Sequence, residues 1–381
     1  MLERNAQFFQ LFGTGDDPQA FFCPGRVNLI GEHIDYLGGY VMPAAISLGI
    51  TGLIRPSQEQ SIRLASTSFE GITELDLNSL PEKKRGQWSD YVLGVIHAVR
   101  KEGIEIGGFE LLLDSTLPKG SGLSSSAALE VLAYFMLHSV FGKSMPDRTT
   151  MATACQRVEN EFIGVQCGIM DQFAVANGKA KHAMLLNCST LEVRNVPLNL
   201  GKHTLVIIDS KKPRKLAESA YNQRRKECDN ALEIISDQRI LEQLVDATET
   251  DLQLLSDPIL KKRTRHAYSE QNRVLEAESA LQKGDLRQFG KLLTASHLSL
   301  RNDFEVSCTE LDFIVDFLIN SEFCLGARMT GAGFGGCCIA LLKSENANEL
   351  CNALDVVYSK RFGFSPECHI CETANGVHSV T

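Results

Sequence analysis

The chain has 381 residues, of which 44% are hydrophobic and 22% are charged, and its net charge at pH 7 is −9. This is the composition of an ordinary globular protein, and the acidic balance argues against nucleic acid as a main partner, because such a partner needs a basic surface. One hydrophobic core usually stops growing below this chain length, so we expect two domains.

The beginning of the chain and its apolar runs bear on targeting. Residues 1–17 carry several charges and lack the apolar stretch of a secretory signal. No run of about 18 uninterrupted apolar residues occurs, so we expect no membrane span.

The first informative segment is residues 24–39, which combines glycines with charged and amide side chains. Arg26, Glu32 and Asp35 are groups that hydrogen-bond sugar hydroxyls in definite directions, with carboxylates as acceptors and arginine as a donor of fixed charge. A solvated polar turn is the alternative. It does not account for the apolar residues interleaved among the polar ones, which indicate a structured pocket.

The next elements are a helix and a strand. From Trp88, apolar residues recur at helical spacing as far as Val99, which predicts an amphipathic helix. Residues 109–113 then alternate as a strand that ends in the sequence Asp-Ser-Thr-Leu-Pro.

A loop rich in glycine and serine, residues 118–126, follows this strand and leads into an apolar helix over residues 127–136. Gly120 and Gly122 allow tight bends and a close approach to a ligand. Ser124, Ser125 and Ser126 stand at the helix N-terminus, where free N–H groups and the helix dipole favour an anion. Serines that only cap the helix are the alternative. Two glycines and three serines exceed what a turn requires, so phosphate binding is favoured, although the loop is not a Walker A motif.

A further acidic patch spans residues 159–173 and includes Glu159 and Asp171. Asp171 lies between apolar neighbours, so it is not an ordinary surface charge. It is either a structural cap or a group that accepts a hydroxyl proton. Carboxylates of this kind also suit Mg²⁺, which binds one or two protein oxygens together with substrate phosphates.

The second half of the chain differs in composition from the first. A strand is predicted over residues 204–208, and residues 211–301 are charged and helix-like with fewer glycines. This shift puts a domain boundary near residue 198 and divides the chain into residues 1–197 and 198–381. Helices and strands are mixed in both halves, so we expect an α+β protein of two domains.

A second glycine-rich loop, residues 329–336, precedes a predicted strand over residues 337–342. Taken alone it is best interpreted as a tight hairpin, because its four glycines permit positive φ. Beside the first loop, it suggests a second wall of one active site.

Twelve cysteines are spread along the chain, several of them in apolar segments where a reduced thiol behaves as a small hydrophobic group. We therefore expect a reducing, cytoplasmic location. Cys368 and Cys371 form a C-x-x-C pair, but a structural zinc site would need a second pair, so two half-buried strand cysteines are favoured.

The three motif blocks together resemble the signature motifs of the GHMP kinases. Within that family, residues 25–36 look like the signature of the galactokinase branch, and residues 168–172 and 221–228 agree further. The likeness extends from about residue 20 to 345. It implies the two-domain α+β GHMP kinase architecture with the active site in the cleft between the domains. It also implies ATP-dependent phosphorylation of galactose at the 1-hydroxyl, which gives galactose 1-phosphate and ADP.

The resemblance assigns roles to matching positions. Asp171 is the expected catalytic aspartate, and Arg26 the residue that stabilises the transferring phosphoryl group. The expected sugar-binding residues are Glu32, His33, Ile34, Asp35, Gly168 and Tyr221. The expected ATP-binding residues are Ser66, Gly120, Ser121, Gly122, Leu123, Ser124, Ser125 and Ser126. Mg²⁺ is the expected cofactor, held by Ser126 and Glu159.

Phosphoryl transfer has a loose transition state, so positioning and charge neutralisation dominate its catalysis. An aspartate paired with an arginine is a weak base. We therefore predict that Asp171 mainly orients the hydroxyl and takes its proton late.

Three positions depart from the commonest pattern of the galactokinase branch: Ile34 in place of Thr, Leu37 in place of Asn, and Arg214 in place of His. They leave open a kinase of another hexose such as N-acetylgalactosamine. A non-catalytic galactose-sensing protein is the third hypothesis, and the complete serine loop and Asp171 argue against it. The expected partners are a small sugar and ATP, with no nucleic acid or membrane, in a monomer or weak homo-oligomer.

Overall fold

The computed structural model describes residues 2–118, 120–213 and 217–380. The N-terminal domain is built on a six-stranded sheet with the strand order β13-β1-β3-β6-β4-β5. Its neighbouring strands are antiparallel except β4 and β6, which run parallel. The strands are β1 (Gln19–Asn28), β3 (Pro43–Ser57), β4 (Ser61–Ser66), β5 (Phe69–Asp76), β6 (Gly108–Ser115) and β13 (His378–Val380).

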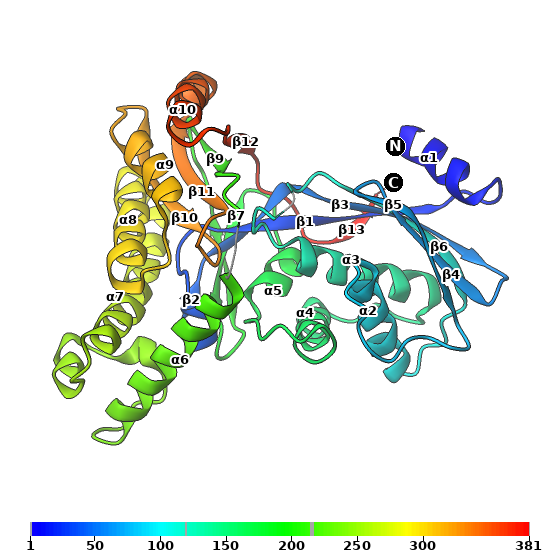
Figure 1. Cartoon of the computed structure of the whole chain (residues 1–381), viewed down its shortest axis with the longest axis horizontal. Helices are drawn as coiled ribbons and strands as arrows, with labels where there is room; N and C mark the ends of the chain where they lie inside the picture. Colours follow the sequence, from blue (N-terminus) through cyan, green and yellow to red (C-terminus); the bar gives the residue numbers. More distant parts are fainter. Residues whose placement is uncertain (1, 119, 214–216, 381) are drawn as a thin grey trace.

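Helices cover both faces of this sheet unequally (Figure 1). One face carries α2 (Ser89–Lys101), α3 (Ser125–Phe141), α4 (Arg148–Arg157) and α5 (Met170–Asn177). Of the described helices, α1 (Leu2–Phe12) covers the other face, and it packs Phe8 and Phe12 on a small cluster around Leu53. Because α3 is apolar on nearly all sides, it is buried between the sheet and its neighbouring helices.

The C-terminal domain has a four-stranded antiparallel sheet with the order β10-β11-β9-β12. Its strands are β9 (His203–Asp209), β10 (Cys324–Thr330), β11 (Cys337–Lys343) and β12 (Glu367–Cys371). Its helices are α6 (Ala217–Ser236), α7 (Pro258–Gln282), α8 (Leu286–Ser299), α9 (Thr309–Ile319) and α10 (Ala347–Phe362). Helices α8 and α9 pack against β10, and α7 lies beside α8 away from the sheet (Figure 1).

A small third sheet combines a strand from between β1 and β3 with two strands that precede β9 in the chain. It has the order β2-β7-β8, with β2 (Tyr40–Val41), β7 (His182–Asn187) and β8 (Val193–Pro197). Short helical turns complete the fold: η1 (Asp35–Leu37), η2 (Val158–Ile163), η3 (Leu244–Asp246), η4 (Glu249–Leu254), η5 (Leu300–Phe304) and η6 (Ser344–Asn346). Across the described residues, none of the helices combines the length and apolar character needed to cross a membrane.

The predicted elements are confirmed at each place tested. The helical pattern from Trp88 forms α2, and the apolar run after the serine loop forms α3. The predicted strands at residues 109–113, 204–208 and 337–342 form β6, β9 and β11. The charged region over residues 211–301 contains α6, α7 and α8. Cys368 is half-buried and Cys371 is buried, and both lie in β12.

The chain passes from the third sheet at β8 into the C-terminal sheet at β9, on either side of the predicted boundary near residue 198. Its last strand, β13, returns to pair with β1 in the N-terminal sheet. The division at residue 198 stays a prediction.

Candidate active site

A cavity of about 700 Å³ lies where the end of β1, the serine loop and the start of α5 meet the C-terminal domain. Side chains from both domains line it. Most of the residues predicted to bind substrate line this one cavity: Arg26, Glu32, His33, Asp35, Gly120, Gly122, Ser124, Ser125, Ser126, Glu159, Gly168, Asp171 and Tyr221.

A paired arginine and aspartate lie at its centre. The Nε and Nη2 atoms of Arg26, on β1, donate to the two carboxylate oxygens of Asp171 at 2.8 and 2.7 Å. Arg26 also donates from Nη1 to the carbonyl of Gly122 at 2.7 Å, which ties it to the serine loop. Arg26 is 4% exposed, whereas the side chain of Asp171 is 30% exposed at the start of α5. The carboxylate is therefore held rigidly and remains accessible to a substrate hydroxyl.

The hydroxyls of Ser124 and Ser126 bond to carboxylates rather than cap the helix. Ser124 precedes α3 with φ of 60° and makes no capping hydrogen bond, and its hydroxyl donates to Asp171 at 2.5 Å. The hydroxyl of Ser126 donates to Glu159. The capping alternative is wrong for these two residues, because both hydroxyls point to carboxylates of the cavity. The backbone N–H groups at the start of α3 are left for an anion.

A second group of carboxylates lies beside Ser126. Burial and the charge of Asp171 raise the pKa of Glu159, despite hydrogen bonds that it accepts from Ser126 and Gln172. Glu130 is fully buried on α3, and burial and the charge of Glu159 raise its pKa well above the usual range. The side-chain amide of Gln172 lies between the two, 2.5 Å from Glu159 and 3.4 Å from Glu130.

The sequence analysis assigned no role to Glu130 or Gln172. The signal for Glu130 was available, because it follows Ser126 by four residues and so lies one helical turn further along the same face of α3.

Gly168 and Asp35 meet in the wall of the cavity. A Cβ atom at position 168 would collide with the carboxylate of Asp35, so any other residue would displace this side chain. Burial and the charge of Asp171, with a further contribution from Glu32, raise the pKa of Asp35 to about 7. Asp35 is thus poised to change its protonation near neutral pH.

His33 is a neutral imidazole with both nitrogens in use. Burial, and then the charge of His266, lower its pKa to about 3. Nε2 lies 3.2 Å from the carbonyl of Ala332 and therefore carries the proton, while Nδ1 accepts from the hydroxyl of Tyr36 at 3.0 Å. The ring also contacts Tyr221 with a centroid distance of 5.4 Å.

The second glycine-rich loop joins β10 to β11 as a hairpin and also lines the cavity through Gly331 and Ala332. The backbone N–H of Gly331 donates to Glu32 at 2.7 Å. The hairpin interpretation is thus confirmed, and the loop also forms part of the cavity wall.

Some predicted residues lie outside the cavity wall. Ile34 is fully buried in the core, and Leu37 is also buried. Ser66 ends β4, where its hydroxyl accepts from the N–H of Ser68. Ser121 and Leu123 are buried parts of the serine loop that do not line the cavity, and Arg214 lies outside the described residues. The binding roles of Ile34, Ser66, Ser121 and Leu123 stay predictions.

The structure adds two lysines that the sequence analysis missed. Lys211 and Lys212 follow β9 and line the cavity. Lys211 pairs with Asp209 at 3.0 Å and with Glu367, and Lys212 pairs with Glu310 at 2.6 Å. Two adjacent lysines at the end of a predicted strand were the available signal.

Comparison with known families agrees with this geometry. The model described as GHMP kinases N terminal domain matches residues 90–179, and the model described as GHMP kinases C terminal matches residues 277–360. The model described as galactokinase galactose-binding signature matches residues 6–56.

Two relatives illustrate the similarity over the whole chain. A galactokinase of Clostridium tetani is 39% identical over 382 residues, which covers 99% of this chain and 97% of the relative. A galactokinase of Streptococcus mutans is 43% identical over 381 residues, which covers 98% of this chain and 97% of the relative.

Solved structures extend the comparison to three dimensions. The crystal structure of Lactococcus lactis galactokinase complexed with galactose superposes with a TM-score of 0.95 at 40% identity, and covers 100% of this chain and 99% of that one. A mevalonate kinase of Methanococcus jannaschii gives a TM-score of 0.72 at 22% identity over 95% and 100% of the two chains, and so shares the fold.

Proposed function

Because this chain belongs to the GHMP kinases and, among them, to the galactokinases, we propose that its cavity binds galactose with the 1-hydroxyl at Asp171 and ATP with its phosphates on the serine loop. The chain catalyses the ATP-dependent phosphorylation of galactose and releases ADP. The observation that carries the assignment of roles is the pair of Arg26 and Asp171, which lies between the serine loop and the sugar-binding segment.

The pair supports transfer by positioning and charge. Asp171 accepts a hydrogen bond from the 1-hydroxyl, orients its oxygen toward the phosphorus atom and takes the proton as the new bond forms. Arg26 has a fixed positive charge beside the reacting atoms, and this charge stabilises the negative charge on the transferring phosphoryl group. The hydroxyl of Ser124 donates to Asp171 and so fixes which carboxylate oxygen is left for the sugar.

The serine loop suits the phosphates of ATP, because its helix N-terminus offers backbone donors and the loop itself has little bulk. Gly120 has φ of 70° and no atom close to its missing side chain, so it is needed for conformation rather than for space.

Ser126 and Glu159 fit a role as ligands of Mg²⁺, because a hydroxyl and a buried carboxylate meet beside the loop. Among the described residues, no three acidic, histidine or cysteine side chains form a complete metal site, so phosphate oxygens of ATP would supply further ligands. The cation supplies positive charge that neutralises the phosphates.

The sugar-binding role extends to Glu32, Asp35 and Tyr221, which line the cavity from both domains. Carboxylates accept from sugar hydroxyls, and the Tyr221 ring offers an apolar face and one hydroxyl. His33 uses both nitrogens within the protein, and we assign it a role in shaping this wall as well as in contacting the sugar.

The last two proposals concern the location of the protein and its oligomeric state. The use of ATP and the burial of cysteines such as Cys155 and Cys338 in the apolar core fit the reducing cytoplasm. A monomer or weak homo-oligomer stays a prediction.

Release of ADP over a panel of sugars tests the proposed substrate. The expected result is the highest kcat/KM with galactose, with N-acetylgalactosamine and glucose at least about tenfold lower. A kcat/KM higher for N-acetylgalactosamine than for galactose would make N-acetylgalactosamine the preferred substrate. Binding of ATP and galactose without ADP release would identify a sensor instead.

A further inference from the structure

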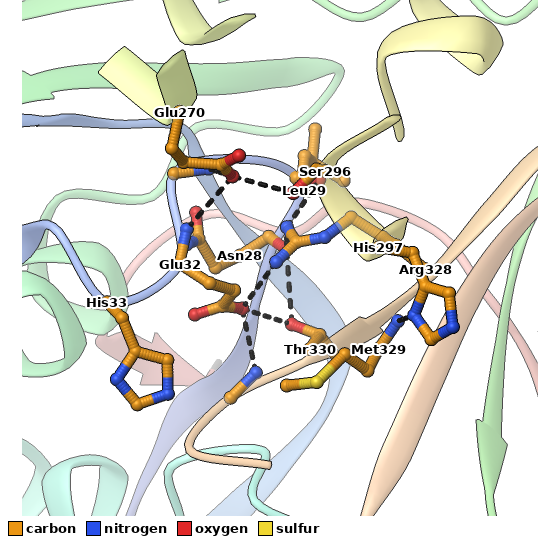
Figure 2. Close-up of polar contacts among 12 residues, drawn as sticks. Asn28, Leu29, Glu32, His33, Glu270, Ser296, His297, Arg328, Met329 and Thr330 are labelled. Carbon is orange, nitrogen blue, oxygen red and sulfur yellow. Dashed lines mark hydrogen bonds and ion pairs between the residues drawn. The ribbon is translucent and has the colours of Figure 1, made fainter. Parts of the chain in front are cut away.

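The segment from Asn28 to His33, which we call the sugar loop, is anchored to the C-terminal domain by buried polar groups (Figure 2). Glu32 is only 3% exposed. Its Oε1 atom accepts from the hydroxyl of Thr330 at 2.9 Å and from the N–H of Gly331 at 2.7 Å. Within the described part of the chain, no donor bonds its Oε2 atom. Glu32 is therefore oriented with one oxygen occupied by protein and the other left for a ligand.

Glu270, on α7, holds the backbone of the same loop. Its Oε1 atom accepts from the N–H groups of Gly31 at 2.9 Å and Glu32 at 3.3 Å, and from the hydroxyl of Ser296 at 2.6 Å (Figure 2). The loop is tightly confined here, because Gly31 has φ of 102° and a Cβ at that position would lie 3.0 Å from the side chain of Val274 on α7. Glu270 is thus bonded directly to the peptide that carries Glu32.

Arg328, on β10, holds the loop from a second side. It is fully buried, and its Nη1 atom donates to the carbonyls of Asn28 at 3.1 Å and Leu29 at 2.8 Å. Its Nη2 atom lies 3.3 Å from Oε1 of Glu32. One guanidinium group therefore contacts both the backbone before Glu32 and the side chain of Glu32 itself.

Burial and nearby charges fix the protonation state of two groups in this network, Glu270 and His266. Burial favours the protonated form of Glu270, but Arg273, His266 and Arg328 together with the Ser296 hydroxyl bring its pKa down to about 2. His266 is neutral, because burial lowers its pKa to about 4, and its Nε2 atom donates to the carbonyl of Glu32 at 3.0 Å. Both peptide groups of Glu32 thus bond to side chains of α7.

Such a network is a costly way to gain stability alone, since buried ions lose hydration that apolar residues of the same size do not lose. Its hydrogen bonds do, however, have fixed directions, and most of them act on the backbone of the sugar loop or on the side chain of Glu32 within it. Orientation of Glu32 is the property that this arrangement secures and that an apolar core would not.

We infer that Glu270 and Arg328 are positioning residues that orient Glu32 toward the sugar from across the domain interface. Neither residue is among those that line the cavity. The inference rests on the proposed binding of galactose beside Glu32. It predicts that their loss weakens recognition of the sugar and leaves the use of ATP nearly unchanged.

The test is the steady-state kinetics of Glu270→Gln, which keeps the size of the side chain and removes its charge. We expect KM for galactose to rise about tenfold, with KM for ATP and kcat within about twofold of the wild type. The matched control is Glu276→Gln, since Glu276 is exposed on the same helix. Arg328→Lys, which cannot bond both carbonyls and Glu32 at once, should raise KM for galactose similarly.

Two further measurements separate positioning from a merely structural role. Saturating galactose should raise the Tm of Glu270→Gln less than that of the wild type, while saturating ATP should raise both equally. A lower Tm with unchanged KM for galactose, or an equal rise in both KM values, would overturn the inference. If Glu270→Gln does not fold, Ser296→Ala decides in the same way, because it removes one donor and leaves the charges in place. Failure of the wild type to phosphorylate galactose would refute the proposed function rather than this inference.

Discussion

The two walls of the cavity hold their carboxylates differently. Asp171 is 30% exposed, and its three protein donors come from Arg26 and Ser124 within its own domain. Glu32 is 3% exposed, and its donors come from β10 and the loop that follows it in the other domain. A carboxylate that takes part in the reaction needs access to substrate, whereas one that recognises substrate needs a fixed direction. We call the side of the cavity with Asp171 and Arg26 the first wall and the side with Glu32 the second wall. The comparison predicts that changes at the first wall lower kcat, and that changes at the second wall raise KM for the sugar.

The largest effect is expected for Asp171→Asn, which keeps the shape of the side chain and removes its ability to take a proton. kcat should fall about 1,000-fold, because both orientation and proton transfer are lost. The Kd of ATP, measured by calorimetry, should change little. Asp237→Asn at an exposed position is the control. Turnover near the wild-type rate would remove Asp171 from the reaction.

Arg26→Lys should follow, with kcat reduced about 100-fold. Lysine keeps the positive charge but cannot bond both oxygens of Asp171 and the carbonyl of Gly122 together. Steady-state kinetics against the exposed control Arg287→Lys measures the loss. A rise in KM for galactose at unchanged kcat would mean that Arg26 serves recognition of the sugar, as the second wall does, and not the reaction.

Ser126→Ala should shift the dependence on Mg²⁺. The concentration of Mg²⁺ that gives half-maximal rate should rise about tenfold, because the proposed ligand and its hydrogen bond to Glu159 are lost. Binding of Mg²⁺ and ATP, followed by calorimetry, gives a readout besides activity. Ser139→Ala on the same helix is the control, and an equal shift in that variant would contradict the role of Ser126.

Thr330→Val, at the second wall, should have a smaller effect on the kinetics. The variant is almost isosteric and removes one of the donors to Glu32, while the N–H of Gly331 remains. KM for galactose should rise about threefold at constant KM for ATP. An unchanged KM for galactose would show that the orientation of Glu32 does not depend on this hydroxyl.

The smallest effect concerns Asp35 and pH. Burial and the charge of Asp171 raise its pKa to about 7, above an unfolded value of about 4. The folded chain therefore binds this proton more tightly, so the stability that it contributes is fully present below pH about 4 and is lost as pH rises through about 7. Asp35→Asn does not titrate. Between pH 5 and pH 8 the Tm of the wild type should fall by about 2 °C more than that of the variant. Parallel Tm profiles would contradict the raised pKa.

The sequence predicted the first wall well because its groups lie in short motifs. Residue types and local spacing indicated Arg26, the serine loop and Asp171, and elements such as α2 and α3 followed from their apolar periodicity. Local patterns did not indicate the positive φ of Ser124 or its bond to Asp171, because both depend on how α5 packs against the loop.

The second wall depends on contacts that no local pattern contains. Thr330 and Glu32 are 298 residues apart, and Glu270 is 239 residues from Gly31. Glu270 resembles any other charged residue of a long polar helix, and only the packing of α7 on the sugar loop reveals that it is buried. Ile34 illustrates the limit of a motif, since its place in the motif suggested contact with the sugar but did not indicate that its side chain lies in the core.

The position of the phosphate on the product tests most directly which end of the sugar faces Asp171 and which faces Glu32. The galactose product is analysed by NMR for coupling between phosphorus and the sugar protons. With the 1-hydroxyl at Asp171 and the other hydroxyls at the wall of Glu32, phosphorus should couple to the anomeric proton. Coupling to the protons on carbon 6 would mean that the opposite end of the sugar faces Asp171, and it would contradict this arrangement.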